Sequence, residues 1–221
     1  LSNAGFSPLC DYTYHSLGGP FLEDFRLIHQ HFPEIQLISV EKSPETFKRQ
    51  KFHKFCKQIR LVESPLDRYL DHDFTPGKRD ILWLDFTDLR ASYFNWIASL
   101  LPRLGNGSLV RVTFPVSPPL HPSTLIFVPI KDRAGEESKR TEKFDSRYSA
   151  FLPTGWNEML SNDYKFSNLI TRMLNRLCEE AALSNSLEAR ILSAHRYADG
   201  QAMMTASIGV IEPEAFNRLG S

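Results

Sequence analysis

The feature that most constrains the fold of this chain is a regular alternation of short apolar runs with segments of helical character. Residues 35–40 form the clearest run, which is rich in β-branched side chains and is followed at once by Glu41. Such runs are typical of strands buried in a parallel sheet. Further strands are expected at residues 12–17, 58–62, 80–85 and 109–114. The alternation predicts an α/β fold with a doubly wound, mostly parallel sheet, right-handed crossovers and helices on both faces.

Local signals place helices between these strands. Ser43 is a capping residue directly before Pro44, which suits the first position of a helix. The turn Gly18-Gly19-Pro20 precedes a helix expected at residues 21–31. Two more helices are expected at residues 66–70 and 88–104.

The second half of the chain changes character after residue 114. Residues 115–164 are rich in proline and charge, so we expect a strand at 124–130 and a mobile charged loop at 131–143. A helix is expected at residues 166–182. Asp199-Gly200 separates two apolar runs, 190–197 and 202–211, and predicts a closing antiparallel β-hairpin.

Charge and cysteine usage narrow the possible functions. The 26 Lys and Arg residues balance 26 Asp and Glu residues, which argues against a protein that works mainly by binding phosphate backbones. The three cysteines are far apart and odd in number, so we expect a reducing, cytoplasmic location and no disulfide framework. No run approaches the roughly 18 apolar residues of a membrane span.

Five strand–helix units followed by a helix and an antiparallel hairpin resemble the class I S-adenosylmethionine-dependent methyltransferase fold, whose seven-stranded sheet ends in such a hairpin. The resemblance covers residues 12–211. It implies S-adenosyl-L-methionine as cofactor and methyl transfer to an unknown substrate. The segments Gly-Gly-Pro-Phe-Leu-Glu-Asp-Phe, Ile-Ser-Val-Glu and Ile-Leu-Trp-Leu-Asp-Phe also look like a poorly characterised bacterial group of methyltransferase-like proteins.

The same resemblance divides the chain into four parts. Residues 1–10 are expected to be a tag or a disordered lead, with Gly220-Ser221 as a second remnant. Residues 11–114 would form the Rossmann-like cofactor-binding half, 115–165 an insertion or lid, and 166–219 the C-terminal helix and hairpin of the same domain.

The resemblance also implies cofactor-binding positions. Gly18 and Gly19 match the loop beneath the cofactor in sequence position. Glu41 matches the acid that binds the ribose hydroxyls, since an ionised carboxylate is purely an acceptor. Glu63 and Ser64 match the position beside the adenine.

The end of the fourth expected strand is where the methyl group is transferred in this fold. Asp85 would orient the nucleophile or accept its proton there, although it could also be a turn residue before the next helix. Phe86 would pack on the cofactor or belong to the core.

One departure from the family pattern supports a second hypothesis. The usual first motif is an acid followed by three alternating glycines, whereas this chain has two adjacent glycines and then Pro20, which lacks a backbone donor. A catalytically inactive methyltransferase-like binding or interaction module is therefore the alternative. A nicotinamide-dependent oxidoreductase is disfavoured, because the chain lacks Gly-x-Gly-x-x-Gly and ends in the hairpin.

Other patterns have two readings. The basic residues of segment 48–57 could contact nucleic acid, but a solvated helix face with its aromatic side chains turned to the core is the commoner outcome. These basic residues are Lys48, Arg49, Lys51, His53, Lys54 and Lys57. His29 and His31 lie at a helix end where their rings diverge, so no metal site is expected. His195 and Tyr197 share one strand face and could line a substrate pocket or the core.

Overall fold

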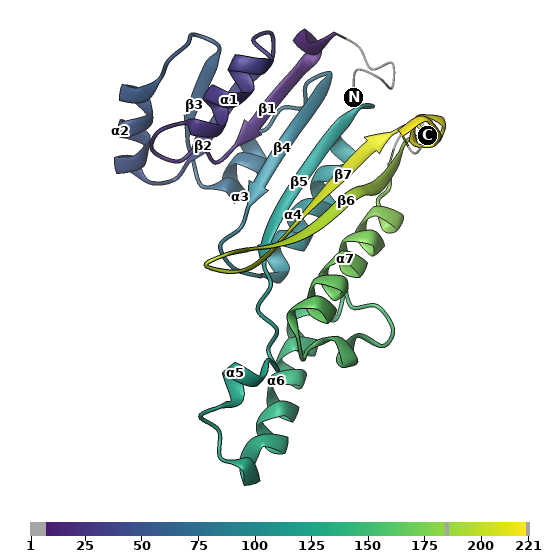
Figure 1. Cartoon of the computed structure of the whole chain (residues 1–221). Coiled ribbons are helices and arrows are strands. Elements are labelled where there is room, and N and C mark those ends of the chain that lie inside the picture. The colour runs from purple at the N-terminus through teal and green to yellow at the C-terminus, as the bar shows by residue number, and fades with distance from the viewer. Residues whose placement is uncertain (1–7, 184–185, 220–221) are drawn as a thin grey trace.

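Seven strands form one sheet in the order β3-β2-β1-β4-β5-β7-β6 in the computed structural model, which describes residues 8–183 and 186–219 (Figure 1). The strands are β1 (Tyr12–Ser16), β2 (Gln36–Glu41), β3 (Ile59–Glu63), β4 (Arg79–Asp85), β5 (Ser108–Pro115), β6 (Glu188–Asp199) and β7 (Gln201–Ile211). The first five are parallel, and β7 lies antiparallel between β5 and β6. The predicted fold class and closing hairpin are confirmed.

Helices cover both faces of this sheet. The helices are α1 (Glu23–His31), α2 (Pro44–His53), α3 (Leu66–Arg68), α4 (Ala91–Leu100), α5 (Pro122–Leu125), α6 (Arg133–Tyr148), α7 (Asp163–Glu180) and α8 (Pro213–Leu219). Phe25 of α1 is fully buried against Tyr14 and Leu37 on one face. On the other face, Phe94 of α4 and Ile170 of α7 belong to the larger core cluster. Burying one such side chain contributes about 1.5–3 kcal/mol.

Two predicted turn signals are used as expected. The Ser43 hydroxyl accepts the Thr46 backbone N–H at 3.3 Å, so it caps α2. Gly200 joins β6 to β7 with φ +70°, a left-handed conformation that glycine adopts without strain.

The region from 115 to 164 differs most from expectation. The strand predicted at 124–130 is wrong, because α5 and a 3₁₀ turn, Ile130–Asp132, lie there instead. The predicted charged loop is also wrong: α6 occupies most of it. Glu136 and Arg140 form an i,i+4 ion pair at 2.8 Å on this helix, and Phe144 and Tyr148 are buried one turn apart. The charged run is therefore the solvated face of an amphipathic helix.

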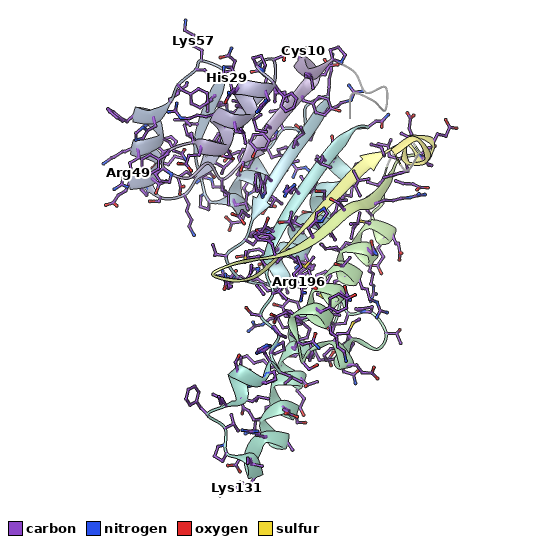
Figure 2. The ribbon with its side chains drawn as sticks, in the orientation of Figure 1. Cys10, His29, Arg49, Lys57, Lys131 and Arg196 are labelled. Carbon is purple, nitrogen blue, oxygen red and sulfur yellow. The ribbon has the colours of Figure 1, made fainter. Side chains whose placement is uncertain are left out.

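Helices α5 and α6 form an arm that extends away from the sheet (Figure 1). Lys131 marks its far tip in Figure 2. The tip also carries exposed apolar side chains, with Phe127 94% exposed and Ile130 82% exposed. The base of the arm packs against the body through Phe144, whose ring lies 5.8 Å from that of Phe166 on α7.

Smaller differences concern helix boundaries and faces. The helix expected from residue 21 begins at Glu23, because Leu22 adopts φ +56°. The helix expected at 88–104 is confined to α4, and a 3₁₀ turn, Leu101–Arg103, follows it. The aromatic side chains of segment 48–57 do not all face the core, since Phe52 is 85% exposed. Arg49 and Lys57 point outward in Figure 2.

Two negative findings apply to the described residues. No helix in this part of the chain is both long and apolar enough to cross a membrane. Within the same ranges, no cluster of three or more His, Cys, Asp or Glu side chains could hold a metal ion. The expected remnants at residues 1–7 and 220–221 lie outside the described residues.

Candidate functional site

The carboxyl ends of the parallel strands bring most of the predicted site residues to one edge of the sheet. The chain leaves β1 toward β2 and returns on the other side of β1 through β4, so a topological switch point lies between β1 and β4. Ligands of doubly wound sheets bind at such a point, beyond the carboxyl ends of the strands. Glu41 and Glu63 are register partners there, and the Ser64 backbone N–H donates to the Glu41 carbonyl at 3.0 Å.

The Glu41 carboxylate is half-buried and has a defined orientation. Its Oε1 accepts the Ser43 backbone N–H at 2.7 Å. No hydrogen bond from another described residue reaches the second oxygen, Oε2. A carboxylate fixed by one oxygen in this way holds the other oxygen in a defined place, where it can accept from hydroxyl groups.

The two adjacent glycines serve different purposes. A Cβ at Gly18 would lie 2.5 Å from Ser39 Oγ and 2.7 Å from Phe25 Cε2, so only glycine allows α1 to approach the sheet this closely. Gly19 has φ +52° and nothing within 4 Å of a Cβ position, which leaves its surface open. The turn therefore keeps two roles of a glycine-rich loop: Gly18 allows the helix to pack closely on the sheet, and Gly19 leaves the backbone accessible.

Gln50 of α2 holds this turn, although nothing in the sequence analysis identified it. Its side chain is fully buried, its Nε2 donates to the Gly19 carbonyl at 2.8 Å, and its Oε1 accepts from Ser39 Oγ at 3.1 Å. Gln50 therefore links the glycine turn to β2 and α2. The sequence offers one signal that Gln50 is buried: it lies three residues after Phe47, on the same face of the helix.

Hydrogen bonds between buried polar side chains link β1 to the start of β4 and to the turn after α3. Nε2 of His15 lies 3.1 Å from Oδ1 of Asp80, and Nδ1 of His15 lies 2.7 Å from the Tyr69 hydroxyl. Burial raises the pKa of Tyr69, so this hydroxyl keeps its proton near neutral pH. Asp80 also accepts the Gly77 backbone N–H at 2.9 Å.

Tyr69, the last residue of this hydrogen-bonded series, lies in the wall of the site at the carboxyl ends of the strands. Tyr69 begins a π-helical turn, Tyr69–Asp73, that directly follows α3. Asp73 lies 3.3 Å from Ser64 Oγ, so the same turn is tied to the residue that follows β3. Ser64 is buried, whereas Glu63 is exposed.

The two residues predicted at the end of β4, Asp85 and Phe86, differ in their exposure to solvent. Asp85 is exposed at the edge of the sheet. Phe86 is 4% exposed and stacks on Tyr93, with ring centroids 4.0 Å apart and an interplanar angle of 9°. Of the two readings offered for Phe86, its surroundings match the core.

Asp88, three residues beyond the end of β4, has a carboxylate that hydrogen bonds hold in place. Its Oδ1 accepts the Tyr93 hydroxyl at 2.7 Å, and its Oδ2 accepts Arg90 Nε at 2.7 Å. Desolvation opposes ionisation, but the hydrogen bonds from Tyr93 and Arg90 outweigh it and lower the pKa of Asp88. Burial and the Asp88 contact raise the pKa of Tyr93 to about 12. Asp88 is therefore an anion near neutral pH, and Tyr93 is a neutral donor.

A cavity of about 320 Å³ opens next to Asp88. Asp88 from the loop after β4, Ser117 from the segment after β5 and Gln201 from the hairpin line it. The inner part of α6 contributes Phe144, Arg147 and Tyr148. The Tyr148 hydroxyl donates to the Leu89 carbonyl at 2.7 Å, which ties α6 to the loop after β4. A larger cavity of about 590 Å³ lies between the end of α7 and the start of β6, at the opposite edge of the sheet, and touches none of the predicted site residues.

His195 and Tyr197 of β6 are exposed, and neither lines the cavity beside Asp88. Tyr197 pairs with Met203 of β7 in the hairpin register. Neither residue is therefore brought to the predicted edge site or into the core.

Comparison with known proteins gives a family and a fold. The model of a family described as "Putative O-methyltransferase" matches residues 2–219. The plantazolicin methyltransferase BamL, solved with a triazolic desmethylPZN analog and SAH, is 10% identical with a TM-score of 0.52, over 90% of this chain and 77% of that one. LepI, solved with SAM, is 8% identical with a TM-score of 0.52, over 95% of this chain and 46% of that one.

At these identities the structural likenesses show the fold alone. The chain spans 61% of the length of a transferase from Pyrococcus horikoshii, which is 12% identical with a TM-score of 0.47. No curated protein sequence matches this chain.

Proposed function

We propose that this chain, which belongs to the family described as "Putative O-methyltransferase", transfers a methyl group from S-adenosyl-L-methionine to an oxygen atom of a small molecule. The observation that carries the proposal is that Glu41 and the Gly18-Gly19 turn stand at the carboxyl ends of the adjacent parallel strands β2 and β1, in a sheet with this strand order. S-adenosylmethionine is the cofactor that the family membership supports.

The residues of the edge fit such a cofactor. Glu41 would bind the ribose hydroxyls through Oε2, because Oε1 is already bonded to Ser43. The open surface of Gly19 would face the methionine moiety, and Gln50 would keep the turn in place. The adenine would lie near Ser64, whose backbone N–H already extends the link between β2 and β3.

When bound, the cofactor supplies an electrophilic methyl group on a sulfonium centre. The protein has to hold the acceptor oxygen in line with that group and exclude competing nucleophiles. The cavity beside Asp88 is the place we assign to the acceptor, because it adjoins the end of β4 and contains both apolar and polar groups. Asp85, at the exposed end of β4, remains the second candidate to orient the nucleophile or take its proton.

Calorimetry with S-adenosylhomocysteine tests the cofactor site. We expect saturable binding, and Glu41→Ala should weaken it by about tenfold or more, since an acceptor of two hydroxyl donors is lost. Glu34→Ala is the matched control, because Glu34 is an exposed acid just before the other end of β2. Absence of binding at millimolar ligand would refute the proposal, and equal losses in both variants would refute the role of Glu41.

A further inference from the structure

Arg147 gives the cavity beside Asp88 a positive charge on its α6 wall. It lines the cavity next to Tyr148, and its side chain is solvent-exposed. Among the described residues, none of the ion pairs includes Arg147. Burial raises the pKa of Tyr148, and the neighbouring positive charge of Arg147 opposes that rise.

Neighbouring arginines differ from Arg147 because internal acceptors hold them. Arg140 bonds Glu136, Thr124 and the Pro119 carbonyl, and so fastens α6 to α5. Arg90 pairs with Asp88 at the other wall of the cavity. These contacts hold the side chains of Arg140 and Arg90 against the protein, whereas Arg147 is exposed and lines the cavity.

The floor of the cavity is aromatic. The rings of Phe144 and Tyr148 lie 4.5 Å apart, and Phe166 meets Phe144 edge-on at 5.8 Å. All three side chains are buried. A volume of about 320 Å³ is at the lower end of the range for small-ligand sites, which suits a compound with one ring rather than a large substrate.

The two charges of the cavity have opposite signs, which orients a ligand. The Asp88 carboxylate is paired with Arg90 and can still accept from a hydroxyl, whereas the Arg147 guanidinium attracts a carboxylate and can hold it with two parallel hydrogen bonds. A molecule with a hydroxyl at one end and a carboxylate at the other satisfies both walls.

We propose that the methyl acceptor is a small aromatic hydroxy acid whose carboxylate binds Arg147, whose ring packs on Phe144 and whose hydroxyl faces Asp88. This rests on the proposed function. In the transfer, the bond between the methyl carbon and sulfur breaks with its electron pair left on sulfur. The hydroxyl oxygen bonds to the methyl carbon, and its proton leaves to water at the open mouth of the cavity. Asp88 orients the hydroxyl and does not keep the proton.

Binding of matched probes tests this assignment. With the protein saturated by S-adenosylhomocysteine, calorimetry would compare 2-, 3- and 4-hydroxybenzoate with the corresponding hydroxybenzamides, which have the same shape without the charge. We expect at least one acid to bind about tenfold or more tightly than its amide. Arg147→Gln should abolish that difference. Lys143→Gln, which removes one positive charge from an exposed position one turn earlier on α6, should leave it unchanged.

Each outcome bears on one proposal. Equal affinity for acid and amide, or retention of the difference in Arg147→Gln, overturns the role of Arg147. If S-adenosylhomocysteine binds but no hydroxybenzoate does, the acceptor class is overturned and the proposed function stands. If S-adenosylhomocysteine itself does not bind, the proposed function fails first. Retained cofactor binding in Arg147→Gln also shows that this variant is folded.

Discussion

Nε2 of His15 lies 3.1 Å from Oδ1 of Asp80, and the side chains are 3% and 0% exposed. This pair joins β1 to the start of β4 inside the apolar layer, where a polar group without a partner is costly. The Tyr69 hydroxyl and the Gly77 backbone N–H complete the hydrogen bonds of the two residues. The contact therefore ties the π-helical turn at the edge site to the opposite end of the sheet.

Replacing His15 by leucine should destabilise the protein by about 2–4 kcal/mol, because the Asp80 carboxylate loses its buried donor. Urea unfolding at neutral pH measures this loss. Asp67→Asn, an exposed acid on α3, should change the free energy of unfolding by less than about 0.5 kcal/mol. A His15→Leu variant as stable as the parent would show that the buried pair is not needed for stability.

Gly18→Ala should destabilise the protein by about 1–3 kcal/mol, since the new methyl group would overlap Ser39, Leu22 and Phe25. Gly135→Ala provides the matched contrast on α6. A Cβ there meets nothing within 4 Å, and alanine favours the helix by up to about 1 kcal/mol. Thermal unfolding should move in opposite directions in the two variants. A similar shift in both would contradict the packing role of Gly18.

Gln50→Ala should weaken the glycine turn more than it weakens the rest of the fold. The Gly19 carbonyl and Ser39 hydroxyl would lose their partner, at a cost of about 1–3 kcal/mol. We also expect weaker S-adenosylhomocysteine binding by calorimetry. Arg49→Ala changes the preceding, exposed residue of α2 and should alter neither quantity. Unchanged affinity in Gln50→Ala would separate the turn from the cofactor site.

Asp24 should make stability depend on pH. Burial raises the pKa of Asp24 above its ordinary value, although the Tyr14 hydroxyl donates to its Oδ2 at 2.9 Å and favours the anion. The folded state therefore holds this proton more tightly than the unfolded state, and its stabilising effect is lost as pH rises through the folded-state pKa.

Asp24→Asn keeps an acceptor for Tyr14 but has no proton to lose. Relative to the parent, the variant should gain stability between about pH 4 and about pH 7, as measured by urea unfolding at several pH values. Parallel pH profiles for the two proteins would refute the assignment. Asp67→Asn should give a profile parallel to that of the parent, because Asp67 is exposed.

The sheet could be predicted because each strand carries its own local signal. Short apolar runs, the Ser43 cap and the Asp199-Gly200 turn depend on neighbouring residues only, and all seven strands lie where those signals place them. The edge position of Glu41 also followed from strand order.

The errors arose where long-range packing decides the structure. The charged run in α6 has only a weak local helical signal, which consists of one i,i+4 pair and two aromatics that become buried only against α7 and the loop after β4. The contact between His15 and Asp80 joins residues 65 positions apart, so no local pattern reveals it. Arg147 was missed for the same reason: its role depends on which cavity α6 lines.

Helix α6 has 16 residues and is about 24 Å long. Its inner end supplies Phe144, Arg147 and Tyr148 to the cavity wall, and its outer end reaches the apolar tip of the arm near Lys131 (Figure 2). Because the Tyr148 hydroxyl donates to the Leu89 carbonyl at the inner end, one continuous helix carries both the wall of the cavity and the base of the arm.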